Sequence, residues 1–142
     1  MQAASFEEVL EQILAKDARY QRDAYLFVRE ALDHTQKLVN KGAKGQIRHV
    51  SPQELLSGIR EYGLETFGPM AITVFEEWGI RTCKDFGEIV FIMVEHSLLA
   101  KTERDSRADF ENGYDFDEAF RKPYLPQSKT AKSLPIAKIA KA

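Results

Sequence analysis

The chain has 142 residues, of which 44% are hydrophobic and 30% are charged, with a formal net charge of −2. This length suits one domain with a sizeable core, and the composition is that of an ordinary globular protein. The longest unbroken apolar run, residues 89–94, is far shorter than the roughly 20 residues that cross a bilayer, so we expect no membrane partner.

Two helices are predicted within residues 1–40. The first begins at Ser5, where Glu8 completes a capping box, and hydrophobic residues then recur at helical spacing. The second carries a continuous apolar stripe from Ala24 to Val39 and ends before a glycine, as helices commonly do. Both patterns are typical of amphipathic helices that pack one face on a core.

The clearest local pattern lies at residues 50–55. Ser51 is the expected N-cap of a third helix, Pro52 occupies the first helical position, and Glu54 closes a capping box. The apolar stripe of this helix continues to Gly68. A fourth helix begins at the proline that follows Gly68, and Gly79 ends it.

A fifth helix between residues 82 and 101 is the element on which we expect the others to pack. Thr82 and Asp85 form a capping pattern, and the apolar pattern that follows is too long for an ordinary strand. Glu88 and Glu95 project about 20° apart, which leaves one narrow polar stripe. We therefore predict that a set of neighbouring side chains is nearly inaccessible to solvent: Trp78, Phe86, Val90, Met93 and Val94.

Aromatic and acidic residues alternate between residues 110 and 120. This pattern fits either a β hairpin or short capped turns of helix, and the sequence leaves both open. From residue 123 onward, Pro, Ser, Ala and Lys dominate without periodicity. We expect residues 1–120 to form a single globular domain and residues 121–142 to form a flexible basic tail.

Several short motifs resemble a small bacterial family of uncharacterised proteins. The resemblance covers about residues 17–120 and implies no activity, because the family has none assigned. The motifs are Arg19-Tyr20 with Arg22-Asp23-Ala24-Tyr25, His49-Val50-Ser51 with Glu54-Leu55-Leu56, Phe67-Gly68-Pro69, Trp78-Gly79, Asp85-Phe86-Gly87-Glu88-Ile89-Val90-Phe91, Asp105-Ser106 and Gly113-Tyr114-Asp115-Phe116-Asp117.

Residues 68–116 also resemble a winged-helix domain at the level of pattern. Two helices separated by a turn are followed by a candidate wing, residues 101–116. In DNA-binding members the second helix enters the major groove and needs an exposed basic or polar face. Here that helix offers Glu88 and Glu95, so the resemblance implies the fold without its DNA-reading function.

The predicted fold class is therefore mainly α. We expect a five-helix domain in which the two N-terminal helices, within residues 1–40, pack on a winged-helix-like unit at residues 51–120. A small β hairpin or wing follows the last helix. The single cysteine, Cys83, cannot form an internal disulfide, and residues 1–8 lack the features of a signal peptide, so we expect a cytoplasmic protein.

Charge is distributed unevenly along the chain. Residues 1–120 carry 14 basic and 22 acidic residues, which is −8, whereas residues 121–142 carry 6 basic residues and no acid. Residues 51–120 alone hold 6 basic and 15 acidic residues, which is −9. A surface of that sign repels phosphate backbones, so we do not expect this half to contact nucleic acid.

No constellation of residues predicts catalysis. His34, His49 and His96 are the only histidines, and no HExxH or CxxC spacing accompanies them or Cys83, so we expect no zinc site and no cysteine nucleophile. GxGxxG, P-loop and GxSxG motifs are missing. An acidic group could bind a hard cation, but acids alternating with aromatics are more typical of a half-buried edge: Asp105, Asp109, Glu111, Asp115 and Asp117. We predict no catalytic, cofactor-binding or metal-binding residue.

The leading hypothesis is a small non-enzymatic interaction or regulatory module. It would bind another protein through an exposed aromatic patch of Phe110, Tyr114 and Phe116. The alternative is a nucleic-acid-associated transcriptional regulator, which would have to use the basic tail or the locally basic residues 37–49. Its candidate anion-contacting residues are Lys37, Lys41, Lys44, Arg48 and His49. An enzyme with an unrecognised site is the third hypothesis.

Overall fold

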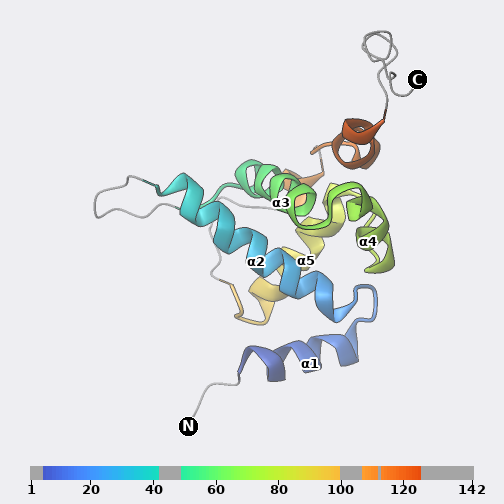
Figure 1. The fold of residues 1–142 in the computed structure, drawn as a ribbon. Coiled ribbons are helices and arrows are strands. Elements are labelled where there is room, and N and C mark those ends of the chain that lie inside the picture. Colours follow the sequence, from blue (N-terminus) through green and yellow to red (C-terminus); the bar gives the residue numbers. More distant parts are fainter. Residues whose placement is uncertain (1–4, 42–48, 100–106, 112, 126–142) are drawn as a thin grey trace, which may run out of the picture.

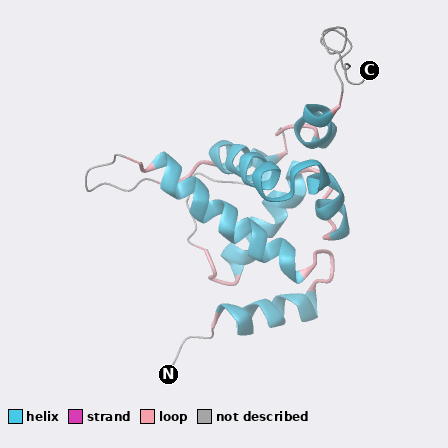
Figure 2. Ribbon diagram, in the orientation of Figure 1, coloured by secondary structure: helices cyan, strands magenta, loops and turns pink. Residues whose placement is uncertain are grey.

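The computed structural model describes residues 5–41, 49–99, 107–111 and 113–125. Within these ranges it contains five α-helices and short 3-10 or π turns, and no β-strand (Figure 1, Figure 2). The mainly helical class predicted from the sequence is confirmed. The α-helices are α1 (Phe6–Lys16), α2 (Arg22–Val39), α3 (Pro52–Phe67), α4 (Ala71–Glu77) and α5 (Cys83–Glu95).

The helix starts follow the capping chemistry expected from the sequence. At α3 the Ser51 hydroxyl accepts a hydrogen bond from the Glu54 backbone N–H at 3.1 Å, and the Glu54 carboxylate accepts one from the Ser51 N–H at 2.9 Å. Ser5 and Glu8 form the same reciprocal pair at α1. At α5 the Asp85 carboxylate accepts from the Thr82 N–H at 3.1 Å. Each box satisfies backbone donors that a helix start otherwise leaves unpaired.

Replacing Ser51 with Ala is expected to lower the free energy of unfolding by about 1 kcal/mol, because the cap of α3 loses its hydroxyl acceptor. Urea unfolding followed by circular dichroism measures the change. Ser57→Ala is the matched control, since Ser57 is exposed in the interior of the same helix and Ala favours helix there. Equal stability of the two variants would contradict the capping role.

The core lies where α2, α3 and α5 meet. In Figure 1, α2 crosses the molecule with α3 above it and α5 behind it, and α1 lies below. α2 and α3 approach closely at Gly58, where an added Cβ would overlap the Thr35 hydroxyl. The Phe75 ring of α4 packs against Phe86 of α5 and against Phe120, with centroids 5.5 and 5.1 Å apart. Aromatic packing therefore joins α4, α5 and the C-terminal turns.

The predicted burial is confirmed for part of the set. Phe86 and Met93 are fully buried, at 0% exposed. Trp78, Val90 and Val94 are only half-buried, so for them the prediction was wrong. Trp78 is the C-cap of α4, and Val90 and Val94 face a groove at the surface.

The expected β hairpin is not found among the described residues. Described residues of the candidate wing and its continuation form short helical turns instead: η2 (Arg107–Phe110), η3 (Asp117–Arg121) and η4 (Lys122–Tyr124). In η3 a helical turn buries Phe116 and Phe120, four residues apart, on one side, whereas their acidic neighbours stay exposed. Of the two alternatives, the helical one is correct here, and the winged-helix-like unit has no support.

Part of the expected tail is also helical. Residues 121–125 follow directly on η3 through η4, so the boundary drawn at residue 121 was too early, and residues 126–142 lie outside the described residues. None of the described helices has the length and apolar composition needed to cross a membrane.

Candidate functional site

Of the three residues predicted as an exposed patch, Phe110 and Phe116 are core residues in the structure, and Tyr114 is half-buried against the core. Phe110 is 2% exposed and Phe116 is 6% exposed. The Tyr114 hydroxyl donates a hydrogen bond to the Leu56 carbonyl of α3 at 2.7 Å, and burial raises the pKa of this phenol far above its usual range. Side chains that are already buried cannot offer a docking patch, so this site assignment is corrected.

Phe110 is buried because α5 carries a glycine where η2 crosses it. A Cβ on Gly87 would lie 2.7 Å from the Phe110 Cβ, so only glycine allows this close approach. The Phe91 ring lies edge-on to Phe110, with centroids 6.2 Å apart. The alternation of acids and aromatics in the sequence therefore reflects a segment that packs onto α5.

Cys83 links the segment that contains Tyr114 to the start of α5 through two hydrogen bonds. The Tyr114 N–H donates to the Cys83 Sγ at 3.3 Å, and the thiol donates to the Tyr114 carbonyl at 3.4 Å. Burial raises the pKa of the Cys83 thiol, which lowers the thiolate fraction at neutral pH. These features give Cys83 a structural role and disfavour a nucleophilic one.

The two acids of the α5 polar stripe are used in ion pairs. The Glu88 carboxylate pairs with Arg19 at 3.5 Å and with Arg107 at 3.6 Å, and Arg107 also pairs with Glu95 at 3.1 Å. Hydrogen bonds from Arg19 hold the pKa of the Asp17 carboxyl below its usual value. These pairs join the α1–α2 connection, α5 and η2, which accounts for the charged stripe without a ligand.

Arg22 and His96, which the sequence also singles out, have interaction partners within the fold. Arg22 pairs with Glu7 and, at 2.8 Å, with Glu11, so it ties α2 to α1. The His96 Nδ1 lies 2.9 Å from the Ile92 carbonyl at the end of α5. No group of His, Cys, Asp or Glu within the described residues could hold a metal ion.

The acidic residues near the C-terminal turns border a surface hollow of about 570 Å³. Glu76, Glu111, Asp115 and Asp117 line it. One Asp115 oxygen accepts from the backbone N–H groups of Asp117 at 3.1 Å and of Glu118 at 3.3 Å, so this carboxylate stabilises the start of η3. Asp105 of the predicted acidic group lies outside the described residues.

A different feature, an apolar groove, opens between α2, α3 and α5. We call it the α2–α3–α5 groove; its volume is about 240 Å³. Ten of its thirteen lining residues are hydrophobic: Leu32, Val50, Pro52, Leu55, Val90, Phe91, Val94, Leu98, Leu99 and Phe110. The other three are Gln36, His49 and Ser51. Among the residues that the structure describes, no lysine, arginine or carboxylate lines it.

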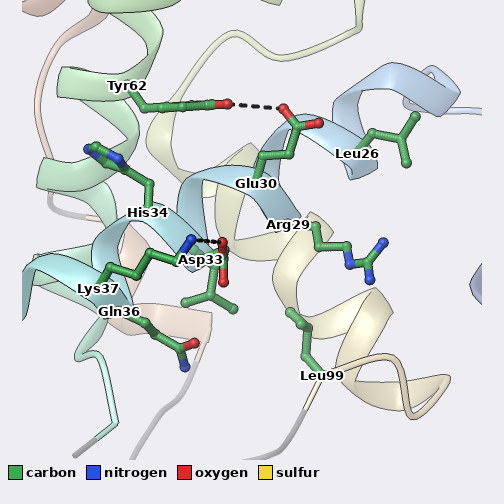
Figure 3. Close-up of a pocket in the computed structure, with 10 residues that line it drawn as sticks. Leu26, Arg29, Glu30, Asp33, His34, Gln36, Lys37, Tyr62 and Leu99 are labelled. Atoms are coloured by element: carbon green, nitrogen blue, oxygen red, sulfur yellow. Dashed lines mark hydrogen bonds and ion pairs between the residues drawn. The ribbon is translucent and has the colours of Figure 1, made fainter. Parts of the chain in front are cut away.

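A larger and more polar hollow of about 640 Å³ runs along the outer face of α2 and adjoins the groove (Figure 3). Leu32, Gln36 and Leu99 line both. In Figure 3 the Tyr62 hydroxyl donates to the Glu30 carboxylate at 3.1 Å, and Lys37 pairs with Asp33 at 3.2 Å. We call this the charged hollow. Together the two make a continuous surface that is apolar on one side and charged on the other.

Three of the five candidate anion-contacting residues are described, and they lie near the end of α2 or the start of α3. His49 lines the groove and Lys37 lines the charged hollow. Lys41 is exposed just beyond the last residue of α2. Lys44 and Arg48 lie outside the described residues.

The groove is not among the predicted sites, although one feature of the sequence points to it. Val90 and Val94 lie four residues apart on α5, and Leu98 follows four residues later in the turn after the helix. This apolar stripe lies beside the fully buried one formed by Phe86, Ile89 and Met93. A helix that is apolar over most of its circumference is predicted to be buried on most sides, and the pattern does not show that the stripe of Val90 and Val94 reaches the surface.

Comparison of the chain with protein families, curated proteins and solved structures finds no match. The bacterial-family resemblance carried by motifs such as residues 19–25 and 85–91 stays a prediction.

Proposed function

We propose that the protein is a non-enzymatic interaction module whose α2–α3–α5 groove receives apolar side chains of a partner protein. The observation that carries this proposal is the mainly apolar lining of the groove, which includes no Lys, Arg, Asp or Glu among the described residues, beside the charged hollow. Protein interfaces commonly combine an apolar centre, which excludes water and supplies most of the energy, with a polar rim.

The size of the groove favours side chains over a metabolite. Its volume of about 240 Å³ lies below the roughly 300–1,000 Å³ of most small-molecule pockets. Two or three large apolar side chains from a docked segment would fill a space of that order. Each buried methylene stabilises such a complex by about 0.8 kcal/mol.

The polar lining favours binding over chemistry. The Ser51 hydroxyl already accepts the Glu54 N–H as the cap of α3, and Gln36 and His49 are the other polar lining residues. A hydrolytic or transfer reaction needs a nucleophile beside a positioned base. The described part of the groove lining provides no carboxylate and no cysteine for that purpose.

Val94→Lys is expected to weaken partner binding at least tenfold, because an ammonium group would project across the groove. Val94 is half-buried, so the lysine stem can follow the wall while its charge reaches water and the fold survives. The probe is a set of short random peptides displayed on phage, selected on the full chain and then measured by fluorescence anisotropy.

Val74→Lys is the matched control, since Val74 is a half-buried valine on α4 that lines neither the groove nor the charged hollow. The selected peptides should bind this variant like the parent. Peptides that bind the Val94→Lys variant as tightly as the parent would refute the groove as the docking site. Circular dichroism melts of both variants show that a loss of binding is not a loss of folding.

A further inference from the structure

We propose that α1 is a lid that opens and closes over α2 while the rest of the fold stays intact, and that the buried hydroxyl of Tyr25 favours its opening. The lid is residues 6–16, and its hinge is the exposed start of the connection to α2, at Asp17 and Ala18. This conformational device does not depend on the docking function of the groove.

The contacts that hold α1 to the fold lie along one side of the helix. In Figure 1, α1 lies at the edge of the molecule, below α2. Leu10 and Ile13 are buried in the core, and Glu7 and Glu11 pair with Arg22 of α2. Both glutamates are mostly exposed, and exposed ion pairs of this kind stabilise little. Apolar contacts therefore supply most of the closing force.

The chain is fixed to the rest of the fold immediately after the hinge. The Tyr20 hydroxyl donates a hydrogen bond to the Asp85 carboxylate at 2.6 Å, which anchors the connection to the start of α5. The Gln21 N–H donates to the Trp78 carbonyl at 3.1 Å, which anchors it to the end of α4. Ala18, by contrast, is exposed. Rotation of the chain before Tyr20 therefore detaches α1 and leaves these two anchors in place.

A detached α1 does not keep its helical structure. The helix has 11 residues, and isolated helices shorter than about 12–15 residues are marginal in water. Opening of the lid is therefore a local unfolding event, which costs less free energy than unfolding of the whole domain. The backbone N–H groups of α1 then exchange with solvent, which makes the opening measurable.

The side of α2 beneath the lid carries a polar group that closure leaves unpaired. Tyr25 is fully buried, and its hydroxyl has no hydrogen-bond partner among the described residues. It follows Arg22 by three residues and precedes Arg29 by four. Both arginines contact α1, since Arg22 pairs with its glutamates and Arg29 lies over the Phe6 ring. Residues at this spacing share one side of a helix, so Tyr25 faces α1.

The unpaired hydroxyl opposes closure. Burial, and to a lesser extent the negative charge of Asp17, raises the pKa of Tyr25 to about 12, so the phenol is neutral at neutral pH. A buried hydroxyl without a hydrogen-bond partner is unfavourable, and opening of the lid returns it to water. The equilibrium is therefore a balance between the apolar contacts of α1 and the hydroxyl of Tyr25.

Opening also changes the wall of the charged hollow. Arg29 lines this hollow (Figure 3), and its guanidinium carbon lies 4.3 Å from the centroid of the Phe6 ring. When α1 leaves, Arg29 loses this aromatic contact and becomes more exposed. The position of α1 is thereby linked to the surface beside the groove.

The test is native-state hydrogen exchange of the full chain, followed by NMR at a series of low urea concentrations. The α1 amides should exchange roughly tenfold or more faster than the most protected amides of α3 and α5. Their exchange should also depend less on urea, because opening of the lid exposes little surface. Tyr25→Phe should slow exchange in α1 by about fivefold or more, since the closed state no longer buries an unpaired hydroxyl.

Tyr20→Phe is the matched control. Tyr20 is also buried, and its ring lies edge-on to that of Tyr25 with centroids 6.4 Å apart. Its hydroxyl, however, is paired with Asp85, so its removal should not slow exchange in α1. Equal slowing in the two variants would show a general effect of removing a tyrosine hydroxyl, and would overturn the role of Tyr25.

Two further results would contradict the lid. If α1 amides exchange at the same rate and with the same urea dependence as the most protected amides of α3 and α5, α1 opens only when the whole domain unfolds. If exchange in α1 is unchanged or faster in Tyr25→Phe, the hydroxyl does not oppose closure in solution. Slower exchange in Tyr25→Phe alone, on top of a weak urea dependence in the parent, is the result that the lid requires.

Discussion

Met93→Asp is expected to unfold the protein. Met93 is 0% exposed and belongs to α5, where the new carboxylate would find no cation among the apolar side chains of the core. An unpaired buried charge costs several kcal/mol or more, and a domain of this kind is stable by only about 5–15 kcal/mol. Circular dichroism should show the loss of the cooperative thermal transition.

Lys84→Asp is the control for this prediction, because it places the same side chain at an exposed position of the same helix. It lies in the first turn of α5, where an acid interacts favourably with the helix dipole. This variant should melt like the parent. A soluble Met93→Asp protein with a cooperative transition would contradict the central position of α5.

Gly58→Val is expected to lower the free energy of unfolding by roughly 2–3 kcal/mol, through overpacking where α3 crosses α2. An added Cβ would overlap the Thr35 hydroxyl and lie 2.9 Å from the Thr35 Cβ. Thr35 is 3% exposed, and its hydroxyl donates to the Ala31 carbonyl at 2.7 Å, so it cannot swing away freely. Removing a helix glycine gains only up to about 1 kcal/mol, so the clash dominates.

A double-mutant cycle tests this explanation. Gly58→Ala should destabilise the parent, but should cost less in a Thr35→Ala background, because the smaller side chain leaves space for the new methyl group. Ser57→Val, at the neighbouring exposed position, should change the melting temperature little. Additive effects of Gly58→Ala and Thr35→Ala would show that the two positions do not meet.

The helices could be predicted because their determinants are local. Ser51, Pro52 and Glu54 fix the start of α3 through contacts within four residues of the chain. The determinant of the end of α4 is equally local, since the backbone of Gly79 has a φ of 92°, which suits glycine far better than other residues. Such features depend little on what the rest of the chain does.

The position of the aromatic segment could not be predicted, because it depends on contacts between distant parts of the chain. Phe110 is buried against α5 at Gly87. The Tyr114 hydroxyl donates a hydrogen bond to the carbonyl of Leu56, 58 residues away. In isolation, alternating acids and aromatics fit an exposed edge as well as a packed turn. The burial follows only once α3 and α5 are in place.

The groove escaped prediction for a related reason. The stripe of Val90 and Val94 belongs to a helix whose pattern predicts burial on most sides, and nothing in that pattern says which stripe lacks a neighbour.

The most direct test of the docking function is methyl NMR of the full chain with labelled valine and leucine, during titration with a peptide selected on it. If the groove is the docking site, the largest chemical-shift changes should map to residues that line it: Val50, Val90, Val94 and Leu98. Val9 on α1 and Val74 on α4, half-buried and outside the groove, should change little. Shift changes that instead cluster at Val9 or Val74 while Val90 and Val94 stay unperturbed would contradict it.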